Sequence, residues 1–425
     1  MTASRPSVRA VDATGTGVYH RRETCRACGG TGLEPVLDLG DQPLANALLR
    51  SPADFATEAV FPLELAFCRD CSLVQILDVV DPEVLFGHYL YVTGTSETIA
   101  EHNERYAEAV IAKLGLAGSD LVAEIASNDG SLLSCFKSRG VRVLGIEPAR
   151  NIADMARARG IETVSRFFDR DAGPSIGASF GRAKAIIGNN VFAHVDDPVG
   201  FLAGCRDLLT DDGLVFIECP YALDMLERGE YDTIYHEHLS YFSVTSLARV
   251  AESAGLSIES VERVSVHGGS IRTAFRKGGV HGAQPQSMMA MEQVEGLTTL
   301  ARWQDFGRAA AQNRHDLLEM LRALIASGNS VAAYGAPAKG NTLLNYCGIG
   351  VDVLPWTVDR NPLKVGLFTP GMHLPVLAVD TITERRPDYL LVLPWNFADE
   401  IMRQQRDYAD AGGRFIIPIP NPRVA

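Results

Sequence analysis

The chain has 425 residues, of which 46% are hydrophobic and 21% are charged, a composition typical of globular protein with room for about three domains. Its net charge of −13 argues against the broad basic face that nucleic-acid binding requires. The sequence contains no apolar run close to the roughly 20 residues of a membrane-spanning helix. The first 20 residues are polar and lack the apolar segment of a signal peptide, so a flexible leader is expected.

Two Cys-x-x-Cys pairs lie within residues 21–80, namely Cys25 with Cys28 and Cys68 with Cys71. Two intervening residues let each pair hold one side of a tetrahedral Zn²⁺, and four thiolates close the site, so the metal is expected to be structural. Residues 37–46, between the pairs, are expected to lie in a long loop. The cysteine pattern is typical of a reduced cytoplasmic protein, and unrelated pairs or redox dithiols are the alternative.

An α/β core is predicted for residues 81–283. After a helical stretch that ends near residue 114, residues 121–125 read as a buried strand followed by a tight turn. Glu147 closes the next strand, where an acidic residue can hold the diol of a ribose. The turn at 126–130, Ala-Ser-Asn-Asp-Gly, lacks the Gly-x-Gly-x-x-Gly pattern that suits a pyrophosphate, so S-adenosylmethionine fits better than NAD. The predicted cofactor-binding residues are Glu124, Ala126, Asn128, Asp129, Glu147, Asn189 and Asn190.

Two further strands, at residues 183–188 and 214–218, end in polar residues. Ligands of open α/β sheets lie beyond the carboxyl ends of the strands, so His194 is predicted to reach the same crevice as the cofactor. A helix from Ser243 to about residue 254 is followed by an antiparallel hairpin of residues 256–266 and 270–276. This order of elements predicts a class I methyltransferase layout.

The most unusual stretch is residues 235–242, Tyr-His-Glu-His-Leu-Ser-Tyr-Phe. It gathers two imidazoles, a carboxylate and two phenols, and neither a helix period nor strand alternation accounts for them. Proton-transfer groups on a short connector are what acid–base chemistry requires. A polar loop whose histidines are structurally satisfied is the alternative.

A second α/β domain is predicted for residues 284–425, after a long helix at about 288–326. A strand at 331–334 leads into a turn with glycine and lysine at 335–342, a plausible cradle for a phosphate or diphosphate. Lys339, Arg360 and Lys364 would supply local positive charge in an acidic protein. A purely structural lobe is the alternative.

Together these motifs resemble the deoxysugar C-methyltransferases of antibiotic pathways, which methylate a carbon next to the ketone of TDP-4-keto-6-deoxyhexoses. The resemblance extends from Cys25 to about Pro422. Its carriers are the two cysteine pairs, Leu-Asp-Leu-Gly at 37–40, Pro-Leu-Ala-Asn at 43–46, the turn at 127–130, His194, the 235–242 run, His-Gly-Gly-Ser at 267–270, Tyr-Gly-Ala at 334–336 and Leu-Pro-Trp-Asn at 393–396. Ala126 departs from the family pattern, which usually has glycine there, and its methyl group bears on cofactor fit.

The resemblance implies a flexible leader (1–20), a Cys₄ zinc module (21–80), a core that binds S-adenosylmethionine (81–283) and a C-terminal domain that helps to bind the nucleotide sugar (284–425). Matched residue by residue, His238 is the general base, assisted by Glu237. Tyr235, His194 and Tyr89 line the reacting sugar and stabilise its enolate, with Tyr91 as the alternative to Tyr89. The expected substrate-binding residues are Tyr91, His267, Ser270, Lys339, Asn341, Arg360, Lys364, Trp395 and Asn396.

The leading hypothesis is therefore C-methylation of an enolate with S-adenosylmethionine, at C3 in preference to C5, by a cytoplasmic monomer that binds neither nucleic acid nor membrane. A neutral imidazole suits the deprotonation, and methyl transfer needs no metal, in agreement with a closed Cys₄ site. One alternative is an epimerase-like enzyme acting on a 4-keto nucleotide sugar. Another is a zinc-bearing nucleotide-binding protein without catalysis.

Overall fold

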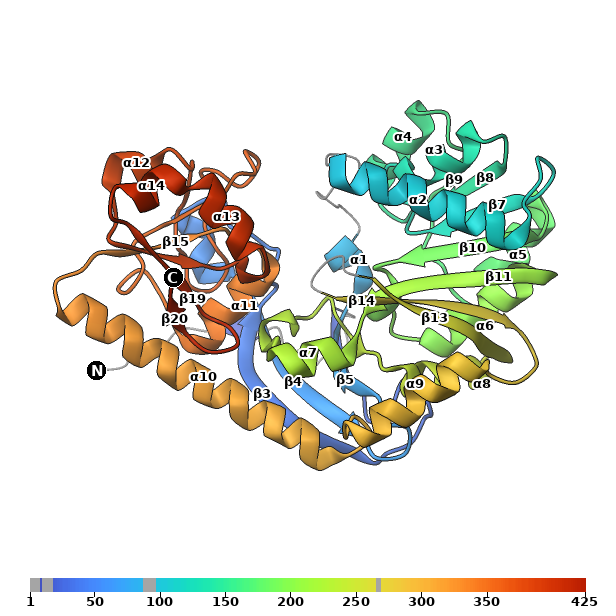
Figure 1. Ribbon diagram of the computed structural model, residues 1–425, viewed down its shortest axis with the longest axis horizontal. Coiled ribbons are helices and arrows are strands. Elements are labelled where there is room, and N and C mark those ends of the chain that lie inside the picture. The colour runs from blue at the N-terminus through green and yellow to red at the C-terminus, as the bar shows by residue number, and fades with distance from the viewer. Residues whose placement is uncertain (1–7, 10–17, 87–96, 265–268) are drawn as a thin grey trace.

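The structure is a computed structural model that describes residues 8–9, 18–86, 97–264 and 269–425. Figure 1 shows two α/β lobes joined by N-terminal strands and by the long helix α10 (Leu300–Ala326). Most of the predicted leader lies outside the described residues. Among the helices of the described part, none combines the length and the apolar composition needed to span a membrane.

The N-terminal strands form a sheet around the long antiparallel pair β3 (Leu33–Pro43) and β4 (Ala59–Cys68). β5 (Val74–Ile76) joins β4, β12 (Ser240–Tyr241) joins β5, and β1 (Val8–Arg9) pairs in parallel with the start of β4. β2 (Tyr19–Arg21) and β6 (Asp78–Val80) form a separate pair. The 235–242 run thus contributes a strand to the sheet of the zinc module.

The predicted long loop at 37–46 is wrong over its first part, because β3 continues to Pro43. Leu37 and Leu39 are buried, whereas Asp38 and Gly40 between them are exposed. This alternation has the period of two that a half-buried strand requires.

The middle lobe is built on seven strands, β7 (Leu121–Ile125), β8 (Arg142–Ile146), β9 (Thr163–Val164), β10 (Ala183–Asn189), β11 (Leu209–Pro220), β13 (Leu256–Val264) and β14 (Ser270–Lys277). Their order in the sheet is β13-β14-β11-β10-β7-β8-β9, and β14 runs antiparallel to both of its neighbours. This is the class I methyltransferase arrangement, and the hairpin predicted from the sequence is present.

Helices cover both faces of this sheet (Figure 1). On one face lie α2 (Glu97–Leu114), α3 (Ser131–Ser138) and α4 (Arg150–Ala158), which pack with Val122 and Ile187. On the other lie α5 (Ala172–Phe180), α6 (Pro198–Leu208) and α8 (Val244–Ser253), which pack with Ala123 and Ile186. Burial on both faces explains why these strands are almost continuously apolar.

The C-terminal lobe has the strands β15 (Val331–Tyr334), β16 (Thr357–Val358), β17 (Val376–Leu377), β18 (Tyr389–Val392), β19 (Arg414–Ile417) and β20 (Arg423–Val424). Their order is β17-β16-β15-β18-β19-β20, and only β20 pairs antiparallel. Its helices are α11 (Ala338–Cys347), α12 (Thr381–Arg385), α13 (Ala398–Gln404) and α14 (Arg406–Asp410). The lobe is a second Rossmann-like unit, as predicted.

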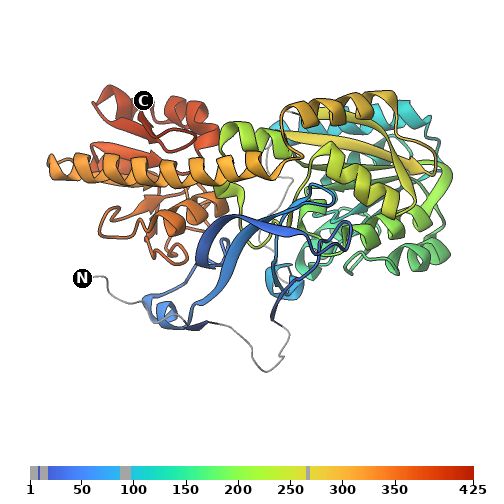
Figure 2. The same cartoon turned by 90° about the horizontal axis from the view of Figure 1, so that it is seen from below.

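The single helix predicted at 288–326 is instead two, α9 (Ala283–Val294) and α10. Gly296 adopts a φ of 81° just after α9, a left-handed conformation that ends helices. From below, α10 runs along the C-terminal lobe (Figure 2), and it also contacts β3. It approaches β3 so closely that a Cβ on Gly307 would lie 2.2 Å from the carbonyl oxygen of Val36.

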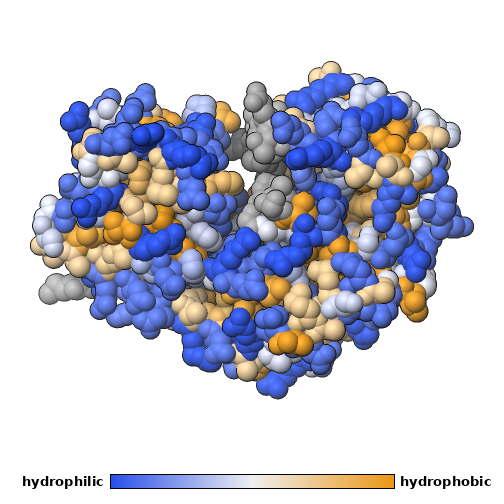
Figure 3. All heavy atoms as spheres, in the orientation of Figure 1, coloured by the Kyte–Doolittle hydropathy of each residue, from blue (hydrophilic) through white to orange (hydrophobic). Residues whose placement is uncertain are grey.

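The space-filling view shows a hollow between the two lobes, bordered mainly by hydrophilic residues (Figure 3). Beneath it, between the lobes, lie α7 (Ala222–Arg228), the short helix η4 (Tyr231–Thr233) and the 235–242 run.

Candidate active site and metal centre

The four cysteines of the two pairs form one cluster, in which all Sγ atoms lie within 4.8 Å of one another. Two of these separations are 3.5 Å, between Cys25 and Cys71, and 3.6 Å, between Cys28 and Cys68. A tetrahedral Zn²⁺ with Zn–S bonds of about 2.3 Å holds its sulfurs about 3.8 Å apart, so the donor set fits this metal. The Gln75 side-chain amide donates to the Cys25 sulfur at 3.1 Å, the kind of outer contact that orients a zinc ligand.

The predicted cofactor residues gather at the carboxyl ends of β7, β8 and β10. Glu147 accepts hydrogen bonds from the backbone N–H groups of Asn128 and Ala149, each at 2.9 Å. Burial, with a smaller contribution from nearby carboxylates, raises the pKa of Glu124 well above its usual value. Glu124 Oε2 and Asn189 Oδ1 are buried and lack hydrogen-bond partners among the described residues. Buried polar atoms without partners destabilise the fold unless a ligand bonds to them. The carboxyl ends of these strands therefore fit the polar, cationic S-adenosylmethionine.

Asp129 has partners from the chain itself. Its carboxylate is paired with Arg159 at 2.9 Å and accepts from the Ser131 hydroxyl at the start of α3. These contacts show that Asp129 also stabilises the fold, in addition to its predicted role in cofactor binding.

The turn between β7 and α3 is held in left-handed backbone conformations. Ala126 has φ 54°, Asn128 has φ 49°, and Asn190 after β10 has φ 52°. Asparagine tolerates this region, but for alanine it costs about 1–2 kcal/mol. Alanine in place of the family's usual glycine at position 126 therefore strains the backbone, which the sequence alone did not show.

We expect Ala126→Gly to stabilise the protein by up to about 1 kcal/mol, because relief of the left-handed strain exceeds the added chain entropy. Denaturant unfolding with and without S-adenosylmethionine would measure it. The matched control is Ala123→Gly on the preceding strand, where glycine should destabilise by about the same amount. A loss of stability in Ala126→Gly equal to that of the control would contradict the strain assignment.

His238 and His194 face each other at the centre of the candidate site. The His238 Nδ1 lies 3.0 Å from the carbonyl oxygen of Thr233. A carbonyl can only accept, so Nδ1 carries the proton and Nε2 is left as an acceptor, 2.9 Å from the Tyr235 hydroxyl. The His194 ring is inclined at 68° to that of His238, with 5.0 Å between ring centroids. Phe86, the last residue of α1 (Pro82–Phe86), packs on His194 with 5.5 Å between centroids.

Both imidazoles are neutral near pH 7. Burial lowers the pKa of His238 to about 3, and the neighbouring His194 adds to this effect. Burial likewise lowers the pKa of His194 to about 4. A neutral imidazole with an unprotonated Nε2 can accept a proton, which is the property that a general base needs.

The side chains of His236 and Glu237, in the same run, bond to residues of the zinc module. The His236 Nε2 donates to the carbonyl of Pro62 on β4 at 3.0 Å, so this histidine anchors the run to the zinc module. The Glu237 carboxylate is buried and accepts from the Asn46 side chain at 2.7 Å. Burial raises the pKa of Glu237 to about 7. The Thr233 carbonyl, rather than Glu237, holds the Nδ1 proton of His238.

The C-terminal lobe reaches the candidate site through Trp395. Its indole N–H donates to the buried Asp232 carboxylate at 2.7 Å, one residue before Thr233. The Lys339 ammonium lies 4.5 Å from the centroid of the same indole ring. Sequence reasoning missed Asp232, since Glu-Tyr-Asp-Thr at 230–233 has the composition of an ordinary polar turn.

Three further predicted substrate-binding residues lie in the C-terminal lobe. The Asn341 amide donates to the Ala45 carbonyl at 2.7 Å and so joins α11 to the zinc module. The Lys364 ammonium donates to the Ala336 carbonyl at 2.8 Å, beside the turn that follows β15. Arg360 lies exposed on the same lobe.

Two other predicted substrate residues have unsatisfied polar atoms. Ser270 Oγ and Asn396 Oδ1 are buried without a hydrogen-bond partner in the described part of the chain. Tyr89, Tyr91 and His267 fall outside the described residues, so their predicted roles stay predictions.

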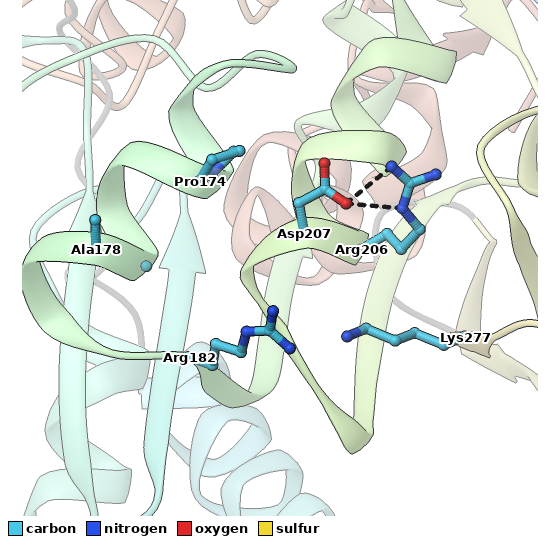
Figure 4. Close-up of a pocket in the computed structure, with 7 residues that line it drawn as sticks. Pro174, Ala178, Arg182, Arg206, Asp207 and Lys277 are labelled. Atoms are coloured by element: carbon cyan, nitrogen blue, oxygen red, sulfur yellow. Dashed lines mark hydrogen bonds and ion pairs between the residues drawn. The ribbon is translucent and has the colours of Figure 1, made fainter.

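A cavity of about 560 Å³ on the middle lobe contains none of the predicted site residues (Figure 4). Its basic side chains are paired with carboxylates, Arg206 with Asp207 at 2.8 Å and Lys277 with Asp211 at 2.9 Å. This cavity is therefore separate from the site predicted from the sequence.

Comparison with known proteins agrees with the geometry. The family model "C-methyltransferase C-terminal domain" matches residues 265–420, "Putative zinc binding domain" matches residues 25–86, and "Methyltransferase domain" matches residues 99–261. Among solved structures, the CcbJ methyltransferase of Streptomyces caelestis aligns with a TM-score of 0.34 and 14% identity over 42% of this chain and 90% of its own. A Synechocystis magnesium protoporphyrin IX methyltransferase with bound S-adenosylmethionine aligns with a TM-score of 0.32 and 14% identity over 43% and 82%. Likenesses this distant support no conclusion.

The sequence relative is much closer. The C-methyltransferase NovU of Streptomyces niveus is 38% identical over 405 residues, which make up 95% of this chain and 96% of NovU. The protein is an S-adenosylmethionine-dependent C-methyltransferase with a zinc-binding module, and it belongs to the deoxysugar C-methyltransferase family.

Proposed function

We propose that the enzyme removes a proton from a carbon next to the ketone of a TDP-4-keto-6-deoxyhexose and methylates the resulting enolate, at C3 in preference to C5. The observation that supports this most directly is the state of His238. Its Nδ1 proton is committed to the Thr233 carbonyl, so the unprotonated Nε2 is the nitrogen left to accept a proton.

In this proposal the C–H bond breaks toward His238 Nε2, and its electron pair forms the enolate. The Tyr235 hydroxyl, now bonded to Nε2, turns to the ketone oxygen when the sugar binds. Tyr235 and His194 then donate to the developing oxyanion, an effect worth a few kcal/mol for each donor, about 3 in measured cases. S-adenosylmethionine supplies the electrophilic methyl group. Tyr89 is proposed to share this role.

The nucleotide part of the substrate is assigned to residues 284–425. Lys339 offers a positive charge beside Trp395, and Trp395 is tied through Asp232 to the segment that holds His238. Asn396 and Ser270 carry buried polar atoms in need of partners. A substrate held there would lie against both lobes, with its sugar toward the histidines.

Glu237 is expected to control the pH dependence. Its pKa is raised to about 7, so the carboxylate that would stabilise the imidazolium of His238 is lost as the pH falls through that value. His238 itself stays neutral there, because its pKa is lowered to about 3. We expect kcat/KM to rise with pH around a midpoint of about 7, and the rise to disappear in Glu237→Gln.

Glu230 provides the matched control, since burial also raises its pKa to about 7. Glu230→Gln should keep the rise in kcat/KM. A pH profile that changes in Glu230→Gln and not in Glu237→Gln would show that Glu237 is the wrong residue.

The proposed reaction is tested by release of S-adenosylhomocysteine from S-adenosylmethionine in the presence of TDP-4-keto-6-deoxyhexoses. Sugar-dependent release with a new carbon-bound methyl group is expected. Loss of the alpha proton without methyl transfer would favour the epimerase-like alternative. Binding of RNA in a gel shift, without any turnover, would favour a nucleotide-binding protein.

The assembly and compartment are also proposals. None of the eight cysteines forms a disulfide, which suits a reducing cytoplasm. We also propose a monomer, because the chain is built of independent domains. A mass of about twice 46.0 kDa in light scattering would contradict this.

A further inference from the structure

Arg26 lies between the zinc ligands Cys25 and Cys28, yet its side chain is 0% exposed. The guanidinium Nη1 donates to the carbonyl of Leu239 at 3.2 Å and also to the carbonyl of Ile76. The Nε donates to the Asp196 carboxylate at 3.1 Å. One side chain of the zinc module thus reaches two segments that lie about 170 and 213 residues away in the sequence.

The second cysteine pair shows that a zinc site of this kind does not need a buried arginine. Arg69 occupies the corresponding place between Cys68 and Cys71. Its side chain is 58% exposed and pairs with Glu34 at the surface, at 2.7 Å. The burial of Arg26 is therefore a property of that position rather than of the Cys-x-x-Cys motif.

Both segments that Arg26 contacts carry a histidine of the candidate site. Leu239 directly follows His238, and Asp196 lies two residues after His194. The two segments also touch each other, because the Leu239 N–H donates to the Ala193 carbonyl at 2.8 Å. Arg26 therefore links the zinc module to both of the segments that carry these histidines.

A buried arginine at this position is unfavourable for the stability of the fold. Burying a guanidinium costs several kcal/mol unless its donors are paired, and an apolar side chain often serves stability as well or better. Gln75 supplies a further acceptor to Nη1 at 3.2 Å. A planar fork of N–H groups can bond several fixed acceptors at once, whereas a lysine ammonium lacks that geometry.

We propose that Arg26 is a positioning residue, which fixes the His194–His238 pair relative to the zinc centre through Leu239 and Asp196. The inference rests on the proposed catalytic roles of the two histidines. It assigns to the zinc module a part in turnover that goes beyond stabilising the fold.

The kinetic test uses Arg26→Met, Arg26→Lys and the matched control Arg69→Met. Misplacement by about 1 Å can cost about 10²-fold in rate, so we expect kcat to fall by roughly that factor in Arg26→Met and by less in Arg26→Lys. KM for the sugar, the stoichiometry of S-adenosylhomocysteine binding and the zinc content should stay near wild type. Arg69→Met should behave as wild type throughout.

A second readout does not depend on turnover. In nitrogen-15 histidine NMR, the His238 Nδ1–H that is bonded to Thr233 should give a protected signal, assigned by its absence in His238→Asn. We expect this signal to be lost or to exchange rapidly in Arg26→Met and to be unchanged in Arg69→Met. Arg26→Lys serves both readouts should Arg26→Met fail to fold.

Unchanged kcat and an unchanged His238 signal in the folded Arg26 variants would overturn the proposal. Loss of zinc in Arg26→Lys would also overturn it, because the residue would then serve the metal site itself. A wild-type enzyme that does not methylate the sugar would contradict the proposed function, while the NMR comparison would still decide the role of Arg26.

Discussion

His238→Asn is expected to lower kcat by about 10²–10⁴-fold, the usual contribution of a general base, with the fold and S-adenosylmethionine binding retained. The asparagine amide can still donate to the Thr233 carbonyl, so the loop keeps its anchor. What the variant lacks is a nitrogen able to accept the alpha proton. Release of S-adenosylhomocysteine measures the rate, and calorimetry with S-adenosylhomocysteine measures the retained binding.

The matched control for His238→Asn is His236→Gln, two residues earlier in the same run. Glutamine can still reach the Pro62 carbonyl that His236 contacts, so turnover should stay near wild type, with a loss of about 1 kcal/mol in stability. Near-normal turnover in His238→Asn would refute its assignment as the base. Equal losses in both variants would mean that the loop, rather than one imidazole, had been disturbed.

Cys25→Ser is expected to abolish zinc binding and to lower the unfolding temperature strongly. A hydroxyl is a poor substitute for a thiolate, and structural zinc contributes folding free energy of order 10 kcal/mol in small zinc modules. The loss should extend to turnover, since β12, which belongs to the 235–242 run, pairs with β5 of this module. Metal analysis and thermal unfolding of the purified variant measure the two effects.

Cys135→Ser is the control for this change, because it makes the same substitution at a buried thiol outside the metal cluster. The serine can keep the bond that the Cys135 thiol donates to the Ser131 carbonyl. Zinc content should be that of the wild type, with only a small change in stability. A stable Cys25→Ser protein that contains no metal would refute the structural role of zinc.

Local patterns allowed much of the fold to be predicted. Cysteine spacing predicted the metal centre, and strand–helix alternation predicted both α/β lobes. Two predicted elements are wrong where a local signal contradicts them. The alternation around Leu37 and Leu39 indicates a strand rather than a loop, and Gly296 indicates a helix end within the single helix predicted at 288–326.

The candidate site was predictable in kind but not in detail. The 235–242 run indicates acid–base chemistry, but its two histidines are equivalent by residue type. The family resemblance implies His238 as the base, and the fold adds that His236 is bonded to the Pro62 carbonyl. Arg26 and Asp232 could not have been found from the sequence. Their partners, Leu239 and Trp395, lie 213 and 163 residues away, and no local period records contacts of that span.

The central claim, deprotonation followed by methylation at one carbon, is tested most directly by proton NMR of TDP-4-keto-6-deoxyhexoses incubated with the enzyme in D₂O. With S-adenosylhomocysteine in place of the methyl donor, we expect deuterium to enter one carbon next to the ketone, and His238→Asn to prevent it. With S-adenosylmethionine, a new methyl signal should appear on that same carbon, at C3. Absence of both exchange and methylation with every such sugar, or a methyl group on oxygen, would contradict the account.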